Sequence, residues 1–195
     1  MKEEGYNITD QFLPHFMTFT VVDWVDVFTR KSYRDLVLQS FEFCRKSKGM
    51  VLFGYVIMSN HIHVIMQSKN GKLSDLVRDF KKFTASNILK MIQNEPESRK
   101  DWMLKRFEFA AKSHGRNDIF QFWKYGSHPE CIFTQKFLWS KLDYIHQNPL
   151  RAGWVEKPED YLYSSARNYA NKNGLIEVDL ADVPIFDATK EFRIS

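Results

Sequence analysis

Two apolar, β-prone runs separated by only two residues constrain the fold of this chain most. Residues 51–58 and 61–67 are rich in β-branched and aromatic side chains, and Ser59-Asn60 lies between them. Two such runs joined by a two-residue loop predict a β-hairpin. The chain therefore contains at least one pair of antiparallel strands.

The other elements follow from the spacing of apolar residues. Residues 31–48, 72–94 and 134–147 show helical periodicity, and residues 15–23 read as a further strand. Residues 95–126 are less regular: we expect a short helix around 102–111 and short strands around 119–123 and 131–133. Antiparallel strands with intervening helices predict an α+β fold, a ferredoxin-like antiparallel sheet with helices packed mainly on one face.

The length of 195 residues suits one domain, and no internal repeat or low-complexity linker divides it. We expect a single domain over residues 10–172, with residues 95–127 as a candidate insertion. The remaining residues, 173–195, are expected to form an extended, poorly packed C-terminal tail.

Composition excludes several classes of protein. With 44% hydrophobic and 15% aromatic residues the chain can build a core, which excludes general disorder. No apolar run approaches the roughly 20 residues of a membrane span, and no signal peptide is visible, so we expect a cytoplasmic protein. Two cysteines make no disulfide framework. A net charge of +4 permits a nucleic-acid partner without requiring one.

His61-Ile62-His63 is the sharpest local feature. Side chains two apart on a strand share a face, so both imidazoles point the same way, with Cα atoms about 6.5–7 Å apart. Two imidazole nitrogens at that spacing can converge on one metal ion. The alternative is two half-buried strand histidines that bind no metal.

Tyr144 and Asn148 form a second pair, four residues apart on the last predicted helix. They share a helical face, which would set a tyrosine nucleophile beside an amide oxygen able to bind a hard metal ion. The alternative is an ordinary helical tyrosine, with Asn148 turning the chain before Pro149. Gln147 could also reach a metal.

A third feature is basic. Arg78, Lys81 and Lys82 lie within about one helical turn of each other, beside the apolar stripe of residues 72–94. Cations of this kind bind nucleic-acid phosphates, and neighbouring aromatic residues can stack on bases. The alternative is a solvated charged face.

Two of these features resemble one known family. Residues 58–66, MSNHIHVIM, resemble the HUH signature as it occurs in single-tyrosine transposases of the insertion-sequence type. Residues 142–155, LDYIHQNPLRAGWV, are similar to the catalytic helix of the REP-associated tyrosine transposases. The motifs occur in the family's order, and the resemblance spans residues 14–169.

The resemblance implies a ferredoxin-like fold with the histidines on a central strand, and a single-stranded DNA substrate that carries a hairpin. It implies that His61, His63 and Asn148 bind a divalent metal, Mg²⁺ or Mn²⁺, although relatives often carry Gln at the position of Asn148. Tyr144 would be the nucleophile that forms a 5′-phosphotyrosyl intermediate during cleavage and strand transfer. Family members include homodimers and monomers, so the resemblance leaves the oligomeric state open.

Two other functions remain as alternatives. One is a non-catalytic regulator that binds DNA or RNA hairpins with the same fold. The other is an unrelated small-molecule metalloenzyme built on His61 and His63. The absence of a nearby third His, Asp or Glu in the sequence argues against the metalloenzyme.

Overall fold

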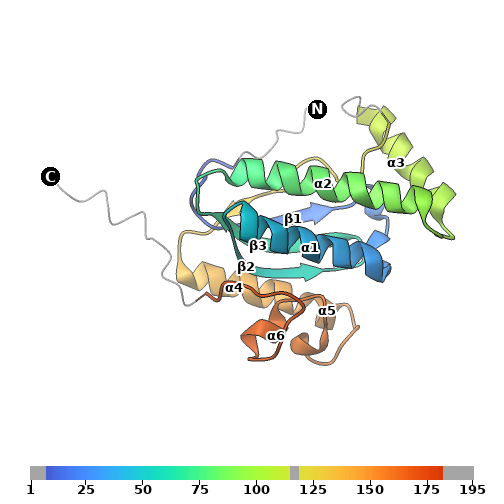
Figure 1. Ribbon diagram of the computed structural model, residues 1–195. Helices are drawn as coiled ribbons and strands as arrows, with labels where there is room; N and C mark the ends of the chain where they lie inside the picture. The colour runs from blue at the N-terminus through green and yellow to red at the C-terminus, as the bar shows by residue number, and fades with distance from the viewer. Residues whose placement is uncertain (1–7, 115–118, 182–195) are drawn as a thin grey trace.

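Four antiparallel strands form the centre of the protein, which is seen here in a computed structural model that describes residues 8–114 and 119–181 (Figure 1). The order across the sheet is β2-β3-β1-β4. The backbone N–H of Met58 donates to the carbonyl of His61 at 2.9 Å and closes the two-residue loop between β2 and β3, so the predicted hairpin is confirmed. The strands are β1 (His15–Thr20), β2 (Met50–Ile57), β3 (His61–Ser68) and β4 (Glu130–Cys131).

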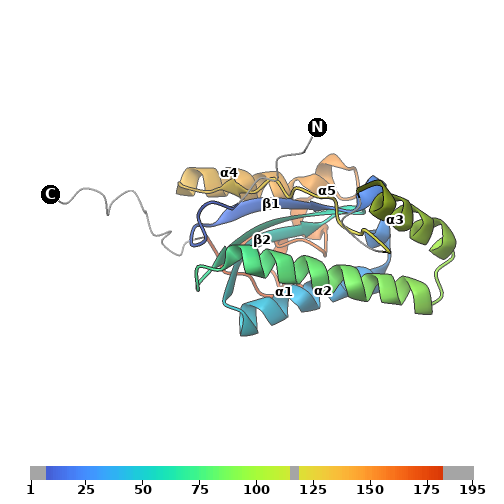
Figure 2. The same ribbon diagram turned by 90° about the horizontal axis from the view of Figure 1, so that it is seen from above.

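Helices cover both faces of this sheet. The two longest, α1 and α2, lie on one face, and α4 and α5 lie on the other (Figure 2). Alternation along β3 explains the two layers, because Ile62 and Val64 join the core under α1 and α2 while Ile65 joins the core under α4. The helices are α1 (Lys31–Ser47), α2 (Leu73–Asn94), α3 (Lys100–His114), α4 (Gln135–His146), α5 (Asn148–Arg151) and α6 (Ala166–Tyr169), with short 3-10 turns η1 (Val22–Trp24), η2 (Val27–Thr29) and η3 (Pro158–Asp160).

The predicted α+β class with an antiparallel sheet is thereby confirmed, and so are the three long helices, to within one or two residues at each end. The expectation that the helices pack mainly on one face is wrong, because both faces of the sheet are apolar and α4 covers the second one. Within the described residues, no helix combines the length and the apolar character that crossing a bilayer requires.

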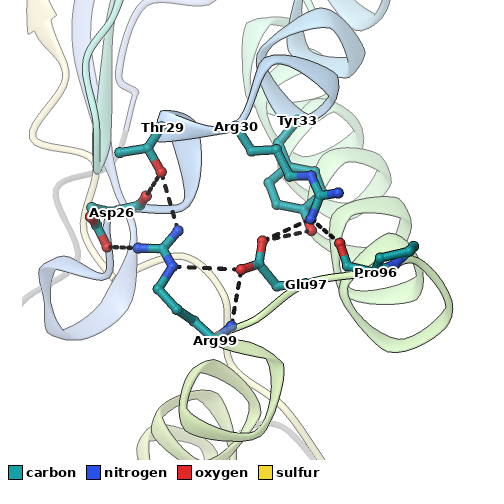
Figure 3. A network of polar contacts seen from close by, with 7 residues as sticks. All are labelled: Asp26, Thr29, Arg30, Tyr33, Pro96, Glu97 and Arg99. Atoms are coloured by element: carbon teal, nitrogen blue, oxygen red, sulfur yellow. Dashed lines mark hydrogen bonds and ion pairs between the residues drawn. The ribbon is translucent and has the colours of Figure 1, made fainter.

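The connection from α2 to α3 is held against the start of α1 by a polar network (Figure 3). The nearly buried Glu97 carboxylate accepts hydrogen bonds from Arg30 at 3.1 Å and from the backbone N–H of Arg99. Burial would raise the pKa of Glu97, but these donors and the two guanidinium charges hold it below its usual value. Arg99 also pairs with Asp26 at 2.7 Å.

After α3 the chain returns to the end of β1. The N–H of Val22 donates to the carbonyl of Phe122, and the N–H of Lys124 donates to the carbonyl of Thr20. The short strand expected at residues 119–123 is reduced to a bridge between Val21 and Trp123. Pairing stops there because β1 ends and Asp23 takes a positive φ.

Gly54 allows α4 to approach the sheet closely. A Cβ atom at this position of β2 would lie 2.6 Å from the Leu142 side chain and 3.1 Å from that of Ile145. Because both contacts come from α4, a residue without a side chain is needed where this helix crosses the strand.

The first part of the C-terminal segment packs on the free edge of β2, where we expected a loose tail. The backbone of Asp179 donates to the carbonyl of Leu52, while its carboxylate accepts from the N–H of Leu52 and pairs with Arg45. Ile176 and Ala181 are buried. The edge of a sheet has unpaired backbone groups, and this segment satisfies some of them. Residues 182–195 of the expected tail lie outside the described residues.

Candidate active site

His61 and His63 lie side by side on the sheet face that α4 covers. Their ring centroids are 4.7 Å apart. His63 is buried and His61 is half-buried. The register of the sheet sets Thr20 opposite His61 and Thr18 opposite His63.

Each imidazole has a hydrogen-bond partner at Nδ1. Thr18 Oγ1 lies 2.8 Å from Nδ1 of His63, and Asn60 Oδ1 lies 2.7 Å from Nδ1 of His61. An amide oxygen only accepts, so Nδ1 of His61 carries the proton and Nε2 keeps its lone pair. Metal-binding histidines are typically oriented in this way, by a partner on the second ring nitrogen.

Burial keeps both rings neutral near pH 7. It lowers the pKa of His61, and it lowers the pKa of His63 to about 3, with smaller contributions from the charges of His61 and Lys141. Neutral imidazole is the form that binds metal ions.

Two neighbouring neutral imidazoles can supply two ligands to one divalent cation, and a side-chain amide oxygen is a candidate for a third. Among the residues described by the structure, no group of three His, Cys, Asp or Glu side chains could hold a metal. Asn148, at the start of α5, donates from Nδ2 to the carbonyl of Tyr144 at 2.8 Å, which leaves Oδ1 as its available ligand atom. Two imidazoles and one amide oxygen would suit a divalent ion such as Mg²⁺ or Mn²⁺ and would leave coordination positions for substrate. The amide of Gln147 instead approaches Asp143.

Tyr144, in the last turn of α4, lies against His63 of the same chain. The two ring centroids are 5.4 Å apart, and a second edge-on contact of 5.9 Å joins Tyr144 to Phe16. The side chain is 39% exposed, and its hydroxyl makes no hydrogen bond to any described residue. The structure thus brings together the two motifs that stand far apart in the sequence.

Two cations that the sequence analysis missed flank this tyrosine. Arg151 holds its guanidinium 5.3 Å from the centre of the Tyr144 ring. Lys141 lies 4.5 Å from the centre of the Phe16 ring and pairs with Glu130 at 2.7 Å. Both cations stand at helical spacing from Tyr144, and that spacing is the signal that could have identified them.

Thr18 and Asn60 were missed for another reason. The alternation of the first strand indicated which residues share a face with Thr18, but the register that sets Thr18 against His63 is a tertiary property. The sequence pattern indicates a turn at Asn60 and gives no sign that its side chain contacts His61.

The basic residues of α2 do not join this site, because α2 covers the opposite face of the sheet (Figure 2). Arg78 pairs with Asp75 at 2.6 Å and with Asp79 at 3.1 Å. Lys81 donates to the carbonyl of Lys124 and to Ser127 Oγ, and burial lowers its pKa to about 8. Lys82 is exposed.

Comparison with known proteins points to one family. Residues 12–125 match the family described as "Transposase IS200 like", a stretch that includes β1, both histidines and α2. The fold is similar to that of a REP-associated tyrosine transposase solved in complex with a REP hairpin. The TM-score is 0.58, the identity is 16%, and the match covers 95% of this chain and 96% of that chain. No curated protein sequence matches significantly.

Proposed function

Because the chain belongs to the family of IS200-like transposases, we propose that it cleaves and rejoins single-stranded DNA through a 5′-phosphotyrosyl intermediate. The observation that carries this proposal is the 5.4 Å ring contact between Tyr144 and His63. A solvent-accessible phenol beside a histidine pair is the arrangement that metal-assisted attack on a phosphodiester requires.

His61, His63 and Asn148 would hold the divalent cation, Mg²⁺ or Mn²⁺. Such an ion, when bound, neutralises charge that develops on the scissile phosphate. The hydrogen bonds at both Nδ1 atoms support the assignment, because they leave the Nε2 atom of each ring as the candidate ligand atom.

Tyr144 supplies the nucleophile. Its phenol oxygen forms a bond to phosphorus as the bond from phosphorus to the 3′ oxygen breaks. The proton that the phenol loses balances the proton that the departing 3′ hydroxyl gains. The energy of the phosphodiester stays in the tyrosyl bond, so a second 3′ hydroxyl can reverse the step on another strand without ATP.

Basic side chains would contact the DNA both at the scissile phosphate and farther from it. Lys141 and Arg151 lie against the aromatic rings of the site and would attract the scissile phosphate. Arg78, Lys81 and Lys82 of α2 would contact phosphates farther along the DNA.

We propose a single strand that carries a hairpin as the substrate. The similar structure is bound to a REP hairpin, and residues 142–155 resemble the catalytic helix of the same group of transposases. A cytoplasmic location would suit this substrate and stays a prediction.

A denaturing gel tests the proposal. The protein is incubated with labelled single-stranded hairpin oligonucleotides from the DNA that flanks its gene, with Mn²⁺ or with EDTA. A covalent adduct to the 5′ phosphate of the downstream fragment, with a free 3′ hydroxyl on the upstream fragment, is expected with Mn²⁺ only. Tyr144→Phe and His61→Ala should abolish the adduct. Tyr161→Phe, which removes a hydroxyl that donates to the carbonyl of Ile57, should keep it.

Two other results of this experiment would separate the transposase from a non-catalytic regulator. Hairpin binding without an adduct would indicate a non-catalytic regulator. Neither binding nor an adduct would contradict both functions.

A further inference from the structure

An exposed tryptophan lies beside the histidine pair. Trp24 is 56% exposed, although large aromatic side chains usually gain stability from burial. Its ring meets the ring of His61 edge-on, with centroids 6.2 Å apart. The indole therefore borders the site, and it is not part of either hydrophobic core.

The backbone holds Trp24 in this position at a conformational cost. Asp23 and Trp24 have φ values of 51° and 56°, in the left-handed region that favours glycine. Neighbouring contacts enforce the conformation: the carboxylate of Asp23 pairs with Arg106 of α3 at 2.9 Å, and the N–H of Trp24 donates to the carbonyl of Val21. Strained non-glycine residues that persist in this way are typical of functional sites.

A cation accompanies the indole. The ammonium group of Lys124 lies 4.8 Å from the centre of the Trp24 ring. The backbone of Lys124 is anchored, because its N–H donates to Thr20 and its carbonyl accepts from Lys81. An exposed aromatic face next to a lysine is the combination that binds a base and its phosphate in single-stranded nucleic acids.

We propose that Trp24 and Lys124 form a binding site for one nucleotide next to the scissile phosphate. The base stacks on the indole and the ammonium group contacts a phosphate. We infer the position of this nucleotide from the contact between Trp24 and His61, because that contact puts the indole at the edge of the candidate metal site. This inference rests on the proposed function, and it assigns to the segment between β1 and α1 a role in holding the substrate.

The test combines substitutions in the protein with abasic sites in the DNA. Trp24→Gly removes the ring and relieves the positive φ, so the variant should fold at least as stably as the wild type. Trp24→Tyr keeps an aromatic face, and Trp102→Ala removes an exposed indole from α3 as a matched control. Affinity for the cleavage-site oligonucleotide is measured by fluorescence anisotropy in EDTA, and the melting temperature is measured in parallel.

Trp24→Gly should weaken binding about 5- to 150-fold, the range for loss of one stacked base. Trp24→Tyr should retain most of the affinity, and Trp102→Ala should retain all of it. An abasic site scanned across the oligonucleotide should weaken wild-type binding at one position beside the cut. The same abasic site should have little further effect on Trp24→Gly. Lys124→Met should weaken binding and lower its salt dependence.

Failure of this inference is distinct from failure of the proposed function. If the wild type forms the adduct and Trp24→Gly binds DNA as tightly as the wild type, the nucleotide site is wrong and the transposase stands. If the abasic site and Trp24→Gly weaken binding additively, the ring does not stack on that base. A wild type that neither binds nor cleaves would overturn both.

Discussion

Two small polar residues orient the histidines of the site. Thr18 comes from β1 and Asn60 from the turn that precedes β3, and each occupies one Nδ1 atom. Side chains in this role often matter almost as much as the ligands themselves, because they fix the tautomer and the direction of the ring.

Replacing Thr18 with Val should therefore weaken metal binding. The change removes the partner of His63 Nδ1 while keeping the shape of the side chain, so we expect a loss of affinity for Mn²⁺ of about 10- to 100-fold. Titration calorimetry measures it. Thr18→Ser keeps the hydroxyl and should bind nearly as the wild type does, and equal losses in both variants would contradict the orienting role.

A buried histidine outside the site makes the stability of the fold depend on pH. His15 is almost fully buried, its Nδ1 lies 2.9 Å from the carbonyl of Leu13, and burial lowers its pKa below 6.5. The folded state therefore binds fewer protons than the unfolded state below pH 6.5, so His15 costs stability as the pH falls.

Urea denaturation of the wild type and His15→Gln at pH 7 and pH 5 measures this cost. One neutral buried histidine contributes at most about 1.4 kcal/mol per pH unit below its unfolded pKa. The free energy of unfolding should thus fall less in His15→Gln than in the wild type between pH 7 and pH 5. Equal losses in both proteins would exclude His15 as a source of the acid sensitivity.

At the scale of elements, the position of α4 decides whether Tyr144 reaches the histidines. The helix crosses β2 where Gly54 has no side chain, and Leu142 and Ile145 fill that space. Tyr144 lies between these two residues in the sequence and is carried to the site by the same helix. The distance between α4 and the sheet therefore determines how closely Tyr144 approaches the histidines.

Gly54→Ala should push α4 outward. The added methyl group would lie 2.6 Å from Leu142, so we expect a loss of about 1–3 kcal/mol in the free energy of unfolding and slower adduct formation. The double variant Gly54→Ala/Leu142→Ala should lose less stability than the sum of the two single variants. Strict additivity, measured by urea denaturation, would show that the two side chains do not compete for space.

The basic residues of α2 belong to a different part of the surface. Because they lie across the sheet from the histidines, their proposed role is to bind DNA and not to take part in cleavage. Lys82→Gln, which changes the exposed lysine and leaves the Lys81 anchor of Lys124 in place, should lower the slope of log K against log salt by about 0.7, the value for one lost phosphate contact. Lys90→Gln, farther along α2, should leave the slope unchanged, and an unchanged slope in Lys82→Gln would disprove the assignment for this residue.

At the scale of the whole molecule, one chain supplies both halves of the candidate site. Tyr144 and His63 are in contact within the same chain, so the geometry favours cleavage by each subunit with its own tyrosine, whether or not the protein forms a dimer. The resemblance to the family left this point open.

Mixing two inactive variants tests it. If each chain uses its own tyrosine, Tyr144→Phe and His61→Ala should stay inactive after they are mixed and allowed to exchange subunits. An adduct in the mixture, on the denaturing gel, would mean that one subunit donates its tyrosine to the histidines of another.

Much of this protein could be predicted without coordinates. The hairpin, the three long helices and the α+β class came from local patterns, and the family suggested by two motifs is confirmed. The common face of His61 and His63 came from the alternation of a strand. These features depend on interactions between residues close in sequence, so the periodicity of side chains is enough to determine them.

Only the tertiary structure decided which distant residues meet. The approach of Tyr144 to His63 depends on how closely α4 packs over Gly54, and the contact of Thr18 with His63 depends on strand register. The exposed position of Trp24 depends on a positive φ that no sequence pattern indicated. Side-chain periodicity states which face a residue occupies, whereas packing and register between distant segments determine what that face touches.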